Sequence, residues 1–294
     1  MQRLLANVLI VFLGAVLSLP AAASGNARAA LKQLEMSMTL TGTIDVEPDG
    51  SVSSVLLHER DKITPAIYDF VHRAAMDWRF EPVLDAKGTA GAVRAPMQLR
   101  LVARDRDDGE MEVAVRSATF AADYDPKDPA QVRYLKQTPP HYPEDAVRAG
   151  VTADVYVAIK IDRDGAVVDV ATRQVNLHQR ASERAMNRWR NSFAKASERG
   201  IRDWRFKVPT EGEDASDPFW VVTAPISFRL VYDETRPDLQ QADRPGVWHA
   251  YLAGPLLDVS WCPSNDGAAD TVPEGGLRMG NEGVVRLVNP IAEY

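Results

Sequence analysis

The chain has 294 residues, of which 45% are apolar and 26% charged, the composition of an ordinary globular protein with room for about two domains. Its 41 acidic and 34 basic side chains give a net charge of -7. Because nucleic-acid binding needs a basic face for the phosphates, this charge argues against a nucleic-acid partner.

The N-terminus has the features of a secretory signal peptide. Arg3 precedes an apolar run over residues 4–19, Pro20 follows it, and residues 21–24 are the small side chains that a signal peptidase needs. The run is shorter than the ~20 residues that cross a bilayer core. We therefore expect residues 1–23 to be a cleaved signal peptide and the chain to be periplasmic. The alternative, in which the run is kept as an inner-membrane anchor, stays open.

The first half of the chain contains an alternating strand pattern followed by a helix pattern. Alternation of apolar and polar residues predicts a strand at 36–46. Two further strands are predicted after it, at 52–57 and 93–101. Asp49-Gly50 predicts a hairpin turn between the first two strands, because such turns need positive φ. Thr64 and Pro65 suit the N-cap and the first position of an amphipathic helix.

The second half repeats this order of elements. Its predicted strands are at 155–161, 167–171 and 220–230. Asp164-Gly165 predicts the hairpin between the first two strands. A helix is predicted from near Ser182, and Gly200 either interrupts it or ends it.

Three sequence blocks occur in both halves in the same order: Asp-Gly-x-Val at 49–52 and 164–167, Asp-Trp-Arg-Phe at 77–80 and 203–206, and a block that begins Ala-Pro at 95–102 and 224–231. Ordered agreement of this kind indicates an internal repeat. The predicted fold is α+β, with two tandem ββαβ modules, each a small antiparallel sheet with one helix packed on it. Pro96 and Pro225 lie inside the third strands, which should leave part of a sheet edge open, because proline cannot donate to the ladder.

This pattern divides the chain into five parts. They are the signal peptide at 1–23, the first module at 24–121, a polar and turn-rich linker at 122–138, the second module at 139–233 and a tail at 234–294. The tail has scattered glycine and proline between short apolar runs. Two alternatives stay open for it, namely that it adds a strand or two or that it is partly disordered.

A combination of motifs in the second module matches a known family. It comprises a Pro-x-Tyr-Pro motif, an alternating strand, a hairpin, an amphipathic helix and a Trp-Arg-Phe motif, carried by Pro140-His141-Tyr142-Pro143, Ala146, Gly150, Asp164-Gly165 and Trp204-Arg205-Phe206. Over residues 139–231 the chain resembles the C-terminal domain of the TonB family. Residues 36–102 look like a degenerate second copy that lacks the Pro-x-Tyr-Pro motif.

The resemblance implies a domain that contacts outer-membrane transporters. In that family a short extended peptide of the transporter pairs with the sheet edge, and the region around the Tyr-Pro motif also contributes. An open edge offers unpaired amides and carbonyls to such a strand. Carried over by position, the partner-binding candidates are Gln137, Pro140, Tyr142, Pro143, Val222, Ala224, Ile226 and Phe228.

The chain departs from the energy transducers of that family, because its N-terminal run looks cleavable and its 19 prolines are scattered rather than gathered in a stiff spacer. We therefore expect a non-enzymatic periplasmic TonB-like protein that binds a peptide or protein of the cell envelope by strand addition, with a TonB-dependent outer-membrane transporter as one candidate partner. The alternative is a TonB-type energy transducer that supports transport across the outer membrane and is anchored in the inner membrane. A homodimer also stays open.

No residue pattern predicts catalysis, a small-molecule cofactor or a metal site. The five histidines lack metal-ligand spacing, and no nucleophile elbow, phosphate loop or dinucleotide fingerprint occurs. Cys262, the single cysteine, is expected to be a small buried side chain. The large aromatic residues of the repeated motif are assigned to the core rather than to ligand stacking: Trp78, Phe80, Trp204 and Phe206.

Overall fold

The computed structural model describes residues 34–58, 60–85, 87–105, 111–120, 124–230, 245–262, 272, 275–279 and 285–289. The apolar run predicted to be a signal peptide lies outside these residues. None of the helices within them combines the length and the apolar character needed to cross a membrane.

The described elements are mostly strands, with a few helices between them. In chain order they are β1 (Leu34–Val46), β2 (Val52–Leu57), α2 (Pro65–Met76), β3 (Val93–Asp105), β4 (Met111–Thr119), β5 (Arg133–Lys136), α3 (Glu144–Ala149), β6 (Ala153–Asp162), β7 (Val167–Leu177), α4 (Glu183–Ile201), β8 (Arg205–Lys207), the 3-10 helix η1 (Glu213–Ser216), β9 (Phe219–Phe228), β10 (His249–Leu252) and β11 (Arg278–Met279). The structure is mixed α+β and mostly antiparallel sheet, which confirms the predicted fold class at that level.

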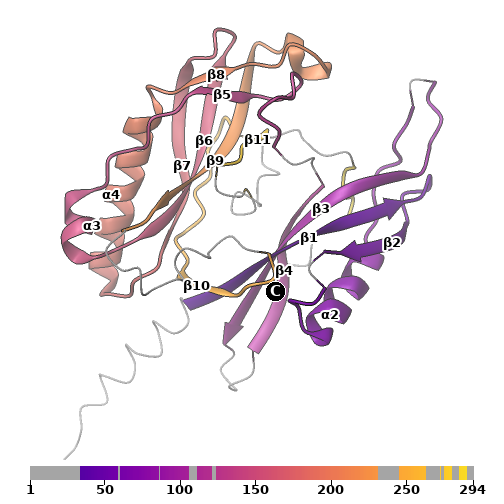
Figure 1. Ribbon diagram of the computed structural model, residues 1–294, viewed down its shortest axis with the longest axis horizontal. Coiled ribbons are helices and arrows are strands. Elements are labelled where there is room, and N and C mark those ends of the chain that lie inside the picture. The colour runs from indigo at the N-terminus through magenta and orange to yellow at the C-terminus, as the bar shows by residue number, and fades with distance from the viewer. Residues whose placement is uncertain are drawn as a thin grey trace, which may run out of the picture.

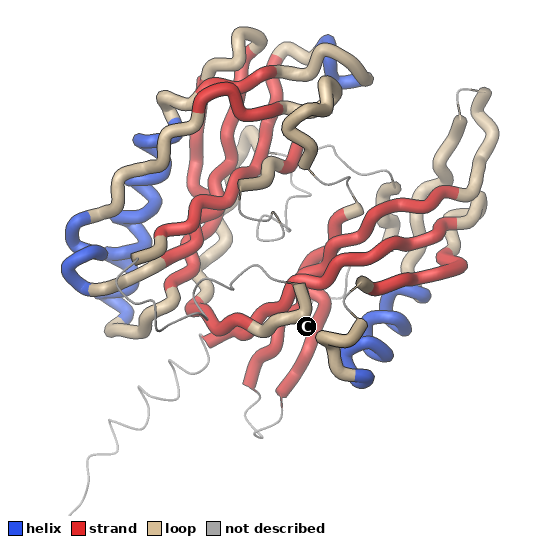
Figure 2. The backbone as a smooth tube through the Cα atoms, viewed as in Figure 1, coloured by secondary structure: helices blue, strands red, loops and turns tan. Residues whose placement is uncertain are grey.

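Nine of the described strands form one sheet in the order β11-β9-β6-β7-β10-β1-β3-β4, with β2 paired to β1. β5 and β8 form a separate two-stranded pair. Figure 1 shows two lobes, with α2 on the lobe of β1 to β4 and with α3 and α4 on the lobe of β6, β7 and β9. The tube view in Figure 2 shows the strands of both lobes with the helices on their outer sides.

Local signals in the first half produce the predicted hairpin and helix. The hydroxyl oxygen of Thr64 accepts a hydrogen bond from the amide of Ile67 at 3.4 Å and caps α2.

β4 is a strand that the sequence patterns did not predict, and it pairs with β3 from Gln98 to Asp105. The edge of β3 is therefore covered over that stretch, whereas Pro96 lies beyond the end of the pairing.

In the second half, α4 begins where the sequence predicted it and ends one residue beyond Gly200. Ser182 caps it by accepting from the amide of Ala185 at 3.4 Å, and the helix continues through Gly200 to Ile201. A Cβ at Gly200 would lie 2.9 Å from Pro140 Cα. This glycine therefore does not interrupt the helix but lets the helix touch the proline segment.

The hairpin and the Trp-Arg-Phe motif are joined in the same way in both halves. The amide of Phe80 donates to the carbonyl of Gly50 at 2.8 Å, and the amide of Phe206 donates to the carbonyl of Gly165 at 2.9 Å. Both glycines have positive φ, 82° and 76°, and a Cβ on either would lie 2.0 Å from the carbonyl oxygen of the phenylalanine. The two motifs recur together because one packs directly on the other.

The repeated aromatic residues lie in the apolar cores of the two halves. Their exposed fractions are 5% for Trp78, 3% for Phe80, 1% for Trp204 and 2% for Phe206. Each pair packs with the apolar faces of the strands in its own half. Cys262 is also buried, and Nη1 of Arg173 lies 2.9 Å from its Sγ.

The C-terminal tail joins the two halves into one sheet. β10 pairs with β1 through four residue pairs and with β7 at Leu252 and Leu177. β11 pairs with β9 at Val222 and Thr223. The described part of the tail therefore adds two strands, which was one of the two open alternatives.

The last described residues of the tail lie beside the first Trp-Arg-Phe motif. Leu287 is bridged to Phe80, and the amide of Glu81 donates to the carbonyl of Arg286 at 2.9 Å. In the second half, β5 lies beside β8 and pairs Tyr134 with Phe206. β5 belongs to the predicted linker. In the second half, the segment beside the Trp-Arg-Phe motif therefore comes from residues just before the half begins. In the first half, the segment beside the motif comes from the C-terminal tail.

Candidate functional site

A groove of about 750 Å³ lies between the proline-rich segment before α3 and the helix α4. Its walls are Lys136, Thr138, Pro139, Pro140, His141, Tyr142, Pro143, Glu144, Asp145, Ser192, Lys195, Ala196, Arg199, Gly200, Asp203 and Arg205. We call this feature the α4 groove. It contains three of the four residues of the predicted Tyr-Pro contact region.

Hydrogen bonds hold the proline-rich wall of the α4 groove at both ends. Trp204 Nε1 donates to the carbonyl of Thr138 at 2.7 Å, and Ser192 Oγ donates to Asp145 Oδ2 at 3.0 Å. Between these points Pro140 packs against α4 at Gly200. Because prolines have a fixed φ and the wall is tied to α4 at one end and to Trp204, just beyond α4, at the other, the groove is preorganised.

Tyr142 is a packing residue with one edge in the α4 groove. Its ring meets Phe193 and Phe228 edge-on, with centroids 5.7 and 5.4 Å away, and its hydroxyl donates to the carbonyl of Val151 at 2.6 Å. Burial raises the pKa of this hydroxyl to about 12, and the charge of Arg229 offsets only part of that effect. The side chain is therefore a fixed neutral wall.

The other predicted contact residues of this region differ in position. Pro140 and Pro143 are half-buried and line the α4 groove, whereas Gln137 is exposed and lies outside its walls. The region around the Tyr-Pro motif is thus one surface, with Gln137 at its margin.

The predicted contact residues on β9 do not line the α4 groove. Val222, Ala224, Ile226 and Phe228 are buried, with exposed fractions of 0%, 0%, 8% and 4%. β11 pairs with this strand at Val222 and Thr223, on the margin expected to be open. The contact between Phe228 and Tyr142 connects this strand to the α4 groove, and the remaining β9 candidates belong to the core.

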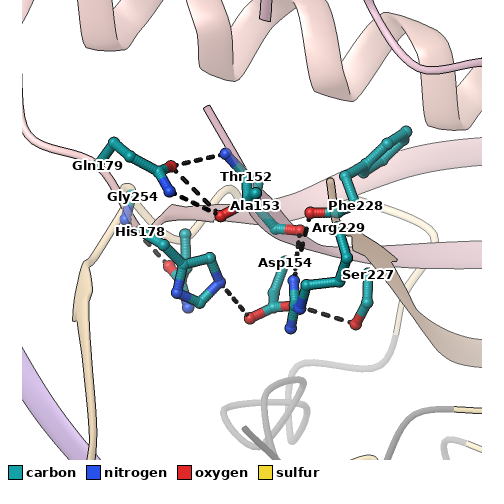
Figure 3. A network of polar contacts seen from close by, with 10 residues as sticks. Thr152, Ala153, Asp154, His178, Gln179, Ser227, Phe228, Arg229 and Gly254 are labelled. Carbon is teal, nitrogen blue, oxygen red and sulfur yellow. Dashed lines mark hydrogen bonds and ion pairs between the residues drawn. The ribbon is translucent and has the colours of Figure 1, made fainter. Parts of the chain in front are cut away.

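A polar cluster outside the α4 groove, shown in Figure 3, links the ends of β6, β7 and β9. Its centre is Asp154, which is 17% exposed. His178 Nε2 lies 2.9 Å from Asp154 Oδ2, and Ser227 Oγ and Arg229 Nη2 lie 3.0 and 2.6 Å from Asp154 Oδ1. Sequence patterns did not single out this cluster, because its members come from three separate strands.

The chemistry of the Asp154 cluster is that of a structural link. Burial alone would raise the pKa of Asp154, but the hydrogen bond with His178 and the charge of Arg229 outweigh burial and hold it well below its ordinary value. A nucleophilic serine needs a histidine to take its proton, whereas Ser227 donates to the carboxylate itself. The cluster therefore fits a fixed ion pair rather than an activated nucleophile.

One residue of the internal repeat points to this cluster, namely the arginine of the Ala-Pro block. Arg100 and Arg229 hold the same place in the repeated Ala-Pro block, and each reaches the first strand of its own half. Arg100 Nη1 donates to Thr39 Oγ1 at 3.1 Å, as Arg229 donates to Asp154. The arginine that occurs in both repeated blocks thus marked a side-chain contact found in both halves of the sheet.

In the described part of the chain, no three His, Cys, Asp or Glu side chains gather in a way that could hold a metal ion. No protein-family model matches this chain, and no curated protein is significantly similar to it.

Proposed function

We propose that this chain is a non-enzymatic binding protein of the bacterial cell envelope, exported to the periplasm, whose α4 groove receives a segment of a partner protein. The preformed shape of the groove is the observation that carries this proposal. A site that is rigid before binding loses less conformational entropy when its ligand arrives.

We further propose that the two halves are tandem ββαβ modules related to the TonB C-terminal domain. The strand order β2-β1-β3 in one half and β7-β6-β9 in the other supports this, as does the shared contact between hairpin and Trp-Arg-Phe motif. The second module then carries the contact surface, because only it has the Pro-x-Tyr-Pro motif.

Strand addition at β9 requires a further step in this proposal. An incoming strand needs free backbone groups along an edge. β11 would have to leave Val222 and Thr223 before a partner strand could pair there. The α4 groove needs no such displacement, so the first contact is assigned to the groove.

Site-specific crosslinking in cells tests the proposal. A photo-crosslinking residue, p-benzoylphenylalanine, is placed at Lys195 in the groove and, as a matched helix control, at Asp69 on α2. We expect one or a few defined protein adducts from position 195 and none of these from position 69. The adducts should disappear when Ala196→Trp fills the groove, with the thermal unfolding of that variant checked first. Equal adducts from both positions, or adducts that survive Ala196→Trp, would reject groove binding.

A further inference from the structure

The charge of the chain is distributed very unevenly. Residues 180–207, which include α4 and β8, contain nine basic and three acidic side chains and so carry +6, whereas the whole chain carries -7. The remaining residues therefore carry -13. This segment concentrates positive charge in an otherwise acidic protein.

Five of these cations form a stripe along α4 and its C-cap residue. Arg184, Arg188, Lys195, Arg199 and Arg202 are all exposed. At 100° per residue they fall within an arc of roughly 60° around the helix axis. The stripe lies opposite the buried side of α4, which is formed by Met186, Trp189, Phe193, Ser197 and Ile201.

The stripe is not neutralised within the described part of the chain, where none of its five cations has a carboxylate in ion-pair range. Two of the nearby acids, Glu198 and Asp145, bond to other residues. Glu198 Oε1 accepts hydrogen bonds from the amide and hydroxyl of Thr172 at 3.0 and 2.9 Å, and Asp145 accepts from Ser192. Glu144 and Asp145 also lie in the first turn of α3, where carboxylates stabilise the helix dipole.

The stripe runs into the α4 groove. Lys195 and Arg199 belong to both, and Lys136 and Arg205 add two further cations to the groove wall, which also contains the carboxylates of Glu144, Asp145 and Asp203. A concave groove fits an extended chain better than it fits a flat lipid surface. Among the described residues, none of the exposed large apolar side chains lies on α4, so the helix offers nothing to insert into a bilayer.

We infer that the partner segment is an extended acidic stretch of protein, whose carboxylates lie along the stripe while its backbone enters the α4 groove. This inference rests on the proposed groove function and adds the chemical class of the partner. Long-range attraction between an acidic segment and the stripe would also raise the association rate.

Binding of defined peptides to the full chain tests the inference. The probe is a fluorescent twelve-residue peptide of alternating Glu and Pro, and its control has Gln at every Glu. We expect the Glu peptide to bind at least tenfold more tightly than the Gln peptide, and its affinity to fall steeply as salt is raised, because screening shortens the reach of surface charges. Lys195→Glu with Arg199→Glu should weaken it about tenfold or more.

Matched variants distinguish failure of the acidic-partner inference from failure of groove binding. Arg73→Glu with Lys87→Glu changes the net charge equally but lies in the first half, and it should leave binding unchanged. Equal affinity for the Glu and Gln peptides, abolished by Ala196→Trp, would reject the acidic partner while keeping the groove. Undiminished Glu-peptide binding by Ala196→Trp would reject the groove. Capture by phosphatidylglycerol vesicles that depends on Lys195 and Arg199, without peptide binding, would overturn the inference in favour of a lipid surface.

Discussion

The two halves of the sheet share a strand order but differ beside their Trp-Arg-Phe motifs. In the second half, residues 133–145 run from β5 into the wall of the α4 groove. In the first half, residues 285–289 of the tail lie in the corresponding place, and α2 is shorter than α4. The comparison teaches that the same motif can be flanked by different segments of the chain, and that the flanking segment decides whether a proline-rich groove wall lies beside it.

Removal of the repeated tryptophans should have the largest effect on stability. Trp78→Ala and Trp204→Ala are each expected to lower the free energy of unfolding by roughly 3–5 kcal/mol, because each leaves a large cavity in a core. Urea unfolding measures this. The milder Trp204→Phe should also loosen the groove wall by removing the donor to Thr138, whereas Trp78→Phe should not affect peptide binding. Identical binding by both Phe variants would argue against an anchoring role for Trp204.

The hairpin glycines should respond alike if the two halves are copies. Gly50→Ala and Gly165→Ala are each expected to lose about 2–4 kcal/mol, because the new methyl group meets a backbone oxygen in a residue with positive φ. Thermal unfolding of both variants gives the comparison. A large loss at one glycine and none at the other would break the equivalence of the two joints.

The buried contacts of Arg229 and Arg100 should differ in strength and in pH dependence. Asp154→Asn is expected to lose about 2–3 kcal/mol at pH 7, and Thr39→Val about 1 kcal/mol, because only Asp154 forms an ion pair, which is partly buried. The folded pKa of Asp154 lies below its unfolded value of about 3.9, so its stabilisation is complete above that pH and is lost as the pH falls toward the folded pKa.

Chemical unfolding measured from pH 7 to pH 3 tests whether the stabilisation by Asp154 is lost in acid. The gap between the wild type and Asp154→Asn should stay constant down to about pH 5 and should narrow below about pH 4. Thr39→Val has no titrating group and should show no such narrowing. A gap that widens in acid would contradict the assignment.

The smallest effect is expected where the tail meets the first half. Leu287→Asp should cost about 1 kcal/mol, because the side chain is only half-buried beside Phe80. Hydrogen exchange should become faster at the amide of Glu81, which bonds to Arg286, and stay unchanged at Phe206. Faster exchange in both halves would indicate that the tail supports the whole sheet rather than this one edge.

Sequence reasoning predicted the strands and helices of the repeat, but it missed β4, β5, β8 and α3 and much of the site. The repeated Asp-Gly and Trp-Arg-Phe motifs predicted the hairpins and the aromatic core residues, and Thr64-Pro65 predicted one helix start. The charge of residues 180–207 was visible in the sequence, yet the net charge of the whole chain conceals it. The Asp154 cluster had no local signature, because its members are neighbours only after β6, β7 and β9 have paired.

The amino-acid sequence by itself determined the alternating strands, the two hairpin turns, the helix caps and the internal repeat, because each depends on the conformational preferences of adjacent residues. Only the tertiary structure decided that β4 covers part of β3, that β10 and β11 place the tail in the sheet, and that the proline segment and α4 form a groove. The physical reason is that backbone amides and carbonyls are the same in every strand. Which edges pair therefore depends on the packing of the whole chain rather than on any short stretch of it.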